Sequence, residues 1–98
     1  MYTAIRRYEG VNESAEVVKR ATEEFAPMLR DKPGFIGYWI VDAGEGVVST
    51  ISVFETREAA EASTEAAAGW ARERLADLIT GPPQVTAGPT TGVQAGRD

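Results

Sequence analysis

The chain has 98 residues, 43% of them hydrophobic, which is typical of one small globular domain. Its net charge of −5 and its scattered basic residues argue against nucleic-acid binding. It contains no cysteine and no histidine, which excludes disulfides, thiolate nucleophiles, His-dependent triads and metal or haem sites held by these side chains. Because we find no signal-peptide pattern and no membrane-spanning apolar run, we expect a cytoplasmic protein that does not bind membranes.

The first elements expected along the chain are a strand and a helix. Residues 2–8 are aromatic and β-branched, which predicts a strand. Asn12 or Ser14 is expected to cap the following helix, whose apolar residues recur every three or four positions. Pro27 cannot donate a helical hydrogen bond, so we expect the helix to kink or tighten there and to stop at Pro33.

A hairpin and a second helix follow. Residues 35–41 and 47–54 predict two strands joined by a short glycine-containing loop. Thr56 is expected to cap a long alanine-rich helix over residues 57–79. A glycine and two prolines end this helix, and residues 84–87 predict a short last strand.

The resulting order is β-α-β-β-α-β. It predicts an α+β fold with a ferredoxin-like antiparallel sheet, both helices on one face, and strands one and three in the centre. Residues 1–88 are expected to form this single domain. Residues 89–98 are expected to form an irregular tail because they offer little apolar surface to bury.

The second and third strands are apolar on both sides, whereas a sheet with one wet face should alternate. In strand two the alternate positions are Phe35, Trp39 and Val41 against Ile36, Tyr38 and Ile40. Covering a face of about 400 Å² stabilises by at most roughly 10 kcal/mol per subunit. The stabilisation from covering two such faces exceeds a typical free-energy cost of association of about 4–15 kcal/mol. We therefore expect a homodimer through sheet-to-sheet packing; the alternative is a monomer whose tail covers the sheet.

Two motifs resemble a known family. They are Pro33-Gly34-Phe35-x-Gly37-Tyr38 at the start of strand two, and Val53-Phe54-Glu55-x-Arg57-Glu58-Ala59-Ala60-Glu61-Ala62 after strand three. Over about residues 1–88 the chain resembles the antibiotic biosynthesis monooxygenase-like family of the dimeric α+β barrel superfamily. The resemblance implies oxidation of a small aromatic or polycyclic compound by dioxygen, without a metal or flavin cofactor. A related group in the superfamily degrades haem.

The functional positions of that family are occupied by other residue types here. The resemblance places its mid-strand-one polar residue, often Asn, near Arg6, and its early helix-two Trp or His at Ser63. A later polar residue or haem-ligating His falls near Trp70 to Glu73, where the chain has no His. These differences argue against haem degradation and leave an aromatic monooxygenase only in altered form.

The candidate catalytic residues are Arg6, Ser63 and Trp70, and each also has a purely structural interpretation. Arg6 and Arg7 lie on opposite faces of their strand, and one could anchor an anionic or enolate oxygen. The favoured interpretation is that both reach past the strand end and pair with glutamates. Ser63 is more simply a small residue where helix packs on sheet, and Trp70 is more simply a core residue.

Tyr38, Trp39 and Phe54 are candidate ligand-binding residues. Tyr38 and Trp39 point to opposite faces, so only one can line a pocket under the helices, and the other should lie at the dimer interface. Three glutamates of the second helix are interpreted as a solvated face without a metal: Glu58, Glu61 and Glu65.

Two functions therefore remain open. One is a cofactor-independent monooxygenase, which the family association favours. The other is a non-catalytic dimeric domain that binds a small hydrophobic ligand or serves as a structural module, which the missing family residues favour. An enclosed, polar-lined cavity under the helices would support the first, and a filled core the second.

Overall fold

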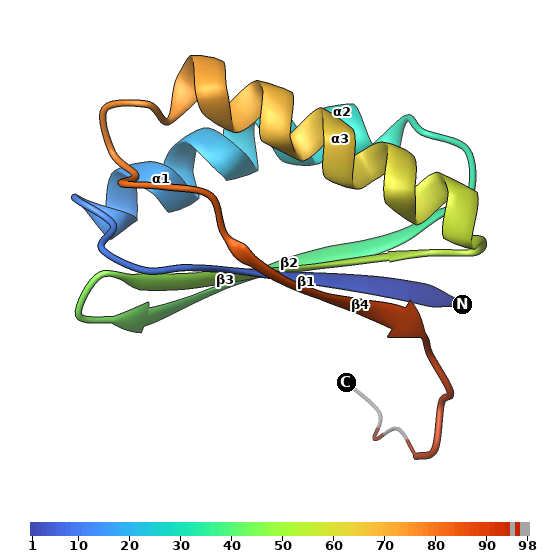
Figure 1. The fold of residues 1–98 in the computed structure, drawn as a ribbon. Coiled ribbons are helices and arrows are strands. Elements are labelled where there is room, and N and C mark those ends of the chain that lie inside the picture. The colour runs from blue at the N-terminus through green and yellow to red at the C-terminus, as the bar shows by residue number, and fades with distance from the viewer. Residues whose placement is uncertain (95, 97–98) are drawn as a thin grey trace.

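A computed structural model of the chain describes residues 1–94 and 96. Four strands form one antiparallel sheet, and the helices cover one of its faces (Figure 1). The strands are β1 Tyr2–Tyr8, β2 Phe35–Gly44, β3 Val47–Phe54 and β4 Gln84–Pro89, in the spatial order β2-β3-β1-β4. The ferredoxin-like α+β prediction is confirmed, including the central position of β1 and β3.

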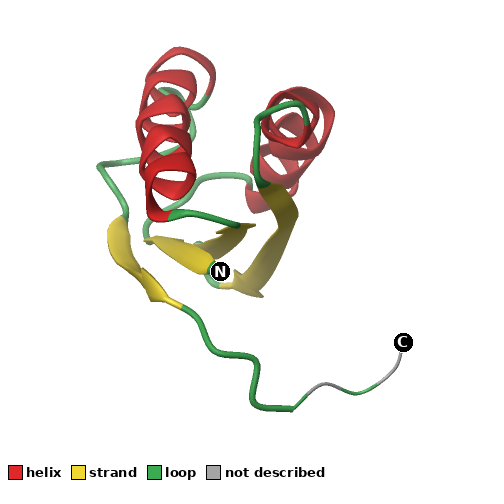
Figure 2. Cartoon of the chain, turned by 90° about the vertical axis from the view of Figure 1, so that its right-hand side faces the viewer, coloured by secondary structure: helices red, strands yellow, loops and turns green. Residues whose placement is uncertain are grey.

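The helical layer consists of two rods that lie side by side on the sheet (Figure 2) and run in opposite directions (Figure 1). The first rod is continuous but changes type: α1 Ser14–Arg20, a π-helical turn η1 Ala21–Phe25, and α2 Ala26–Arg30. The second rod is α3 Arg57–Arg74. No helix in the described part of the chain is both long and apolar enough to cross a bilayer.

The first rod departs from regular α-helix next to Pro27, where a kink or a tighter turn was predicted. The helix widens into η1 just before the proline, so the predicted tightening is wrong. A wider turn gives the ring room, and Pro27 falls in the first turn of α2, where a missing N–H is tolerated.

The predicted cap of the first helix is wrong, and the predicted cap of the second is confirmed. Glu13, with φ of 53°, precedes α1 without a side-chain cap, whereas the Thr56 hydroxyl accepts from the Ala59 N–H of α3 at 3.1 Å.

α3 ends five residues before the predicted position 79. The chain turns at Leu75 to Leu78, and both leucines are buried at 3% and 4% exposure. The Asn12 N–H donates to the Leu78 carbonyl at 2.8 Å, which ties this turn to the loop after β1. The turn therefore places both leucine side chains in the core.

A β-bulge in β2 places Phe35 on the opposite face of the sheet from the one predicted. Pairing with β3 shifts register between Phe35 and Gly37, so Phe35 lies opposite Phe54 on the helix side. Phe35 was predicted to share a face with Trp39 and Val41, and that prediction is wrong because the extra residue reverses the alternation. The strand also runs to Gly44, and Glu45 and Gly46 close the hairpin with positive φ values.

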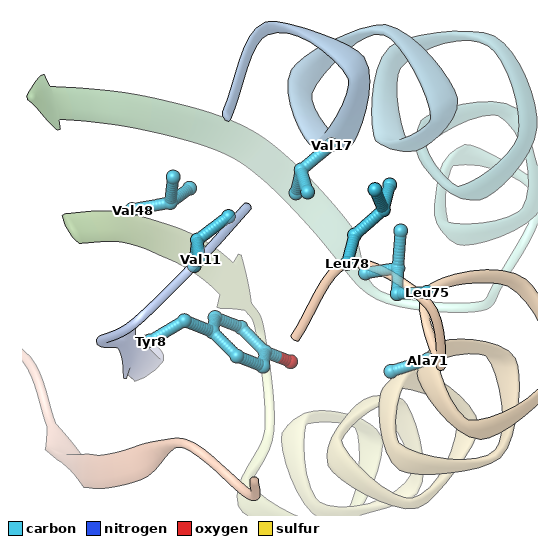
Figure 3. Close-up of a cluster of buried hydrophobic side chains, with 7 residues drawn as sticks. All are labelled: Tyr8, Val11, Val17, Val48, Ala71, Leu75 and Leu78. Carbon is cyan, nitrogen blue, oxygen red and sulfur yellow. The ribbon is translucent and has the colours of Figure 1, made fainter. Parts of the chain in front are cut away.

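The core between sheet and helices has two parts. One cluster, drawn in Figure 3, joins the strands to the end of α3 and comprises Tyr8, Val11, Val17, Val48, Ala71, Leu75 and Leu78. The other comprises Phe25, Leu29, Phe54, Ala60 and Ala67. Trp70 packs against both clusters, so it connects them.

The other face of the sheet carries no helix (Figure 2). Trp39 and Val41 are 54% and 48% exposed there, and a Cβ at Gly37 would collide with the Trp39 ring, which shows that the indole lies over this glycine. β4 ends at Pro89, one residue beyond the predicted domain. The next described residues run away from the helical layer and leave Trp39 uncovered. Predictions for residues 95, 97 and 98 of the tail lie outside the described residues.

Candidate functional site

A buried arginine lies under the helices. Alternation in β1 turns Ala4, Arg6 and Tyr8 toward α3, and Arg6 is only 2% exposed. The prediction that both arginines reach solvent is wrong for Arg6 and right for Arg7, whose Nε pairs with Glu9 at 2.9 Å. β1 is a central strand with neighbours on both sides, so a side chain on its inner face cannot extend past the sheet.

Within the described residues, the Arg6 guanidinium is held only by hydroxyl groups. Its Nη1 donates to the Ser52 Oγ at 3.1 Å, and its Nη2 donates to the Ser63 Oγ at 3.3 Å and the Thr64 Oγ1 at 3.0 Å. Its buried Nε has no partner among the described residues, and no described carboxylate pairs with it. Burial lowers the pKa of Arg6, yet an arginine stays protonated in proteins. In the part of the chain that the structure describes, the site is therefore a buried cation without a counterion.

The hydroxyl groups are oriented by the backbone. The Ser63 Oγ donates to the Ala60 carbonyl at 2.6 Å, and the Thr64 Oγ1 donates to the same carbonyl at 3.3 Å. Because each proton is used on the backbone, each oxygen presents lone pairs to Arg6. The helix thus holds the guanidinium in place without neutralising its charge.

Two tyrosines lie near this cation. Burial raises the pKa of Tyr38 to about 12, against the opposing effect of the Arg6 charge. Burial likewise raises the pKa of Tyr8, again opposed by Arg6. Both phenols therefore keep their protons at neutral pH and can donate a hydrogen bond to an anion.

Arg6 and Tyr8 line two spaces. The first is a cavity of about 20 Å³ between the first helical rod and the sheet. Its other lining residues are Val17, Ala21, Phe25, Tyr38, Ile40, Val48, Thr50, Ala67, Trp70 and Leu75. We call it the small cavity.

The second space is a groove of about 670 Å³ along α3 and β4. Its remaining lining residues are Thr64, Ala68, Ala71, Arg72, Ala76, Ile79, Thr80, Gly81, Pro82, Pro83 and Val85. Two of the four residues of α3 that line it are alanines, Ala68 and Ala71, and β4 makes few contacts with α3, so the space stays open. We call it the groove.

The structure brings four of the sequence-predicted residues together. Arg6 bonds to Ser63, while Tyr38 and Trp70 line the small cavity, each with its ring beside that of Phe25. Two predicted ligand-binding residues lie elsewhere: Trp39 on the outer face, and Phe54 fully buried against Phe35.

Sequence reasoning missed three site residues: Tyr8, Ser52 and Thr64. Ser52 had a signal, because it is a polar residue at an inward-facing position of its strand. Thr64 directly follows Ser63, and on a helix both can reach one partner. The three glutamates of α3 are exposed as predicted, and the described residues contain no group of three side chains able to hold a metal ion.

Comparisons with known proteins agree with this architecture. The family model for antibiotic biosynthesis monooxygenase matches residues 1–68. No curated protein is similar enough to count as a match.

Solved structures with the same fold include three with a described activity or ligand. A monooxygenase from the gene ActVA-Orf6 of Streptomyces coelicolor, in complex with nanaomycin D, has a TM-score of 0.76 at 22% identity, covering 98% of this chain and 92% of that one. The haem degrader MhuD from Mycobacterium tuberculosis, with two haems bound, has a TM-score of 0.71 at 24% identity and covers 98% and 100%. SnoaB, a cofactor-independent oxygenase from Streptomyces nogalater, has a TM-score of 0.65 at 15% identity and covers 96% and 94%. At these identities the likeness establishes the fold.

Proposed function

Because the chain belongs to the antibiotic biosynthesis monooxygenase family, we propose that it is a cofactor-independent monooxygenase acting on the anion of a small aromatic or polycyclic compound. The observation that carries the proposal is Arg6, a guanidinium that is 2% exposed and is held by neutral hydroxyls. A buried, unneutralised cation is costly unless an anion joins it. An enolate or phenolate oxygen is the anion that this family's chemistry requires.

Arg6 favours ionisation of the substrate. A carbon acid or phenol that binds beside it is easier to deprotonate, because a fixed charge in a poorly solvated site stabilises the developing oxyanion. No described Asp, Glu or His lines the groove or the small cavity. The proton therefore leaves to water in the open groove, and the neutral Tyr8 hydroxyl donates a hydrogen bond to the anion.

The groove suits such a substrate in size and polarity. Its volume of about 670 Å³ lies within the range of roughly 300–1,000 Å³ usual for small-molecule sites. Its walls are mainly alanine, isoleucine, proline and valine side chains, which can cover aromatic faces. Arg6 and Tyr8 offer the polar end, and Arg72 lies at another point of the wall.

The reaction consumes one dioxygen per substrate. A substrate CH₂ group loses a proton to give the anion, which is oxidised by dioxygen to a C=O group. One oxygen atom enters the carbonyl and the other leaves as water, so the oxidant and the electrons are both accounted for. Haem degradation is not proposed, because the chain has no histidine or cysteine to ligate haem iron.

We also propose that the protein is a homodimer through its outer sheet face. Ile5, Trp39 and Val41 are 38%, 54% and 48% exposed on that face. An apolar surface of this kind is typical of a protein interface. A second copy of the chain can present the same face in return, as a two-fold interface requires.

Oxygen uptake tests the activity. Purified protein should consume one equivalent of dioxygen with anthrone as substrate, and one labelled atom from ¹⁸O₂ should appear in the product carbonyl. The matched control is 9-methoxyanthracene, which has the same ring system but cannot form the enolate, and it should support no uptake. Equal rates with both compounds, or no rate above buffer across anthrones and hydroquinones, would contradict the proposal.

A binding-only function is the second candidate. It is favoured by the missing base, since the described lining of the groove offers no carboxylate to remove a proton. In that case anthrone would quench the fluorescence of Trp70, yet oxygen would not be consumed. The same two measurements therefore separate the candidates.

A further inference from the structure

The small cavity is apolar although polar residues stand around it. The surface exposed to it is almost entirely carbon, so the polar atoms of Arg6, Tyr8, Tyr38 and Thr50 point elsewhere. Its volume of about 20 Å³ exceeds the roughly 10–15 Å³ that one water needs. A water would also need two or more polar partners, and apolar cavities without them stay dry and take up apolar guests.

The π-helical turn forms one wall of this cavity. Ala21 and Phe25 are the first and last residues of η1, and both are buried and line the space. Ala21 and Ala67 contribute only a methyl group each, whereas Phe25 and Trp70 provide the broad faces. Four further lining residues, which are drawn in Figure 3, come from the strands, α1 and the C-cap of α3: Tyr8, Val17, Val48 and Leu75.

We propose that the small cavity binds dioxygen while the organic anion occupies the groove; this rests on the proposed monooxygenase function. The two spaces share Arg6 and Tyr8. A molecule in the small cavity and a molecule in the groove would therefore lie against different parts of the same two side chains. Dioxygen is small and apolar and matches the size and lining of the small cavity. The groove is too large to hold it in one place.

Arg6 then serves both reactants. The substrate carbanion passes one electron to dioxygen, giving a substrate radical and superoxide, and the single negative charge stays near the guanidinium throughout. The radical and superoxide form a C–O bond, the peroxide takes up one proton, and loss of water leaves the carbonyl. The guanidinium nitrogens point away from the small cavity, so the fixed charge favours superoxide where dioxygen meets the anion on the groove side, for the same electrostatic reason that it favours the enolate.

Dioxygen itself can report the site, because it is paramagnetic and speeds the relaxation of nearby methyl protons. Under dioxygen pressure, compared with dinitrogen, the methyl groups of Val17, Ala21 and Val48 should relax several-fold faster than those of Leu29 and Ala60. The control methyls are as deeply buried, at 0% and 1% exposure, but do not line the cavity. Equal enhancement at both sets, or an ordered water in a crystal structure of the cavity, would overturn the inference.

Filling the cavity gives a kinetic test. Ala21→Leu should abolish the enhanced relaxation and raise the KM for dioxygen about ten-fold, leaving the KM for the organic substrate unchanged. Ala15→Leu makes the same change at an exposed position of the same rod and should alter neither. If Ala21→Leu does not fold, Ala67→Val adds two methyl groups from the opposite rod.

The outcomes distinguish this inference from the function on which it rests. An unchanged KM for dioxygen in a folded, filled variant would overturn the dioxygen site while oxygen uptake continued. A wild-type protein that consumes no dioxygen with any substrate would overturn the monooxygenase. The relaxation measurement would still decide whether the cavity takes up the gas.

Discussion

Each face of the sheet departs in part from the usual polarity. The inner face, under the helices, buries polar groups near its centre: Arg6, Thr50 and Ser52 are at most 8% exposed. The outer face, which no helix covers, exposes large apolar side chains, with Trp39 the most exposed of those on the strands. A domain that acted alone in water would gain stability from the opposite arrangement.

Each departure indicates something the lone chain lacks. The inner face has a cation without an anion, and the outer face has an apolar surface without a cover. Arg6 and Arg7 show the contrast within one dipeptide, since one is 2% exposed and the other is paired with Glu9 at the surface. A substrate anion would complete the first face, and a second subunit the second.

Replacing Arg6 should have the largest effect. Arg6→Met keeps a similar shape without the charge, and we expect kcat/KM for anthrone oxidation to fall about 100- to 1,000-fold. The hydroxyls around Arg6 keep their bonds to backbone carbonyls, so we expect thermal stability to be unchanged or higher. Arg7→Met is the matched control and should change neither the rate nor Tm.

This pair separates chemistry from folding. A loss of activity accompanied by a large loss of stability in Arg6→Met would indicate a structural arginine. Equal activities of the Arg6 and Arg7 variants would remove the inner face as the site. Activity is measured by oxygen uptake and stability by thermal unfolding, on the same samples of each variant.

Placing a charge on the outer face should dissociate the proposed dimer. Trp39→Glu should weaken association at least about 100-fold, because a central aromatic is replaced by a carboxylate that the interface must desolvate. Light scattering at micromolar concentration should then give one chain mass instead of two. Val85→Glu is the control: Val85 is 48% exposed, but pairs with Arg6 and so lies on the helix side. A wild-type monomer would contradict the outer-face argument directly.

The fold followed from the sequence because its signals are local. Strand alternation, the Thr56 cap and the glycine and proline stops each act within a few residues, and together they fix the β-α-β-β-α-β order. The errors came from single irregularities. The bulge before Gly37 reversed the face of Phe35, and the helix widened before Pro27, where a kink or a tighter turn was expected.

The site was only partly predictable, because it depends on contacts between distant residues. Ser63 was found through its family position, but nothing local indicated that Ser52 and Thr64 would meet Arg6 with it. Arg6 itself was expected at the surface, since a long side chain usually reaches water. Its burial depends on the central position of β1 combined with the crossing of α3 above it. Such a contact can be predicted only when the positions of both β1 and α3 in the fold are known.

High pH should destabilise the protein through the inner-face tyrosines. Burial raises the pKa of Tyr38 from 10 to about 12, so the folded state holds this proton more tightly than the unfolded state. The resulting stability, about 2–3 kcal/mol, is complete below pH 10 and is lost as the pH rises toward 12. In Tyr38→Phe, urea unfolding between pH 9 and 12 should show a smaller decline than in wild type. An identical decline would mean that Tyr38 is solvated.

Removing one hydroxyl should test how firmly the inner face holds its cation. Ser63→Ala takes one acceptor from Arg6, whose Nε is already without a described partner, so the buried charge loses about 1–3 kcal/mol of stabilisation. For a domain of this size, Tm should fall by about 4–8 °C per kcal/mol. Ser49→Ala removes a hydroxyl from the outer face of the same sheet and should leave Tm nearly unchanged.

Substrate should raise the Tm of Ser63→Ala more than that of wild type, because the anion then supplies the missing acceptor. An equal rise in both would show that the ligand does not bind beside Arg6.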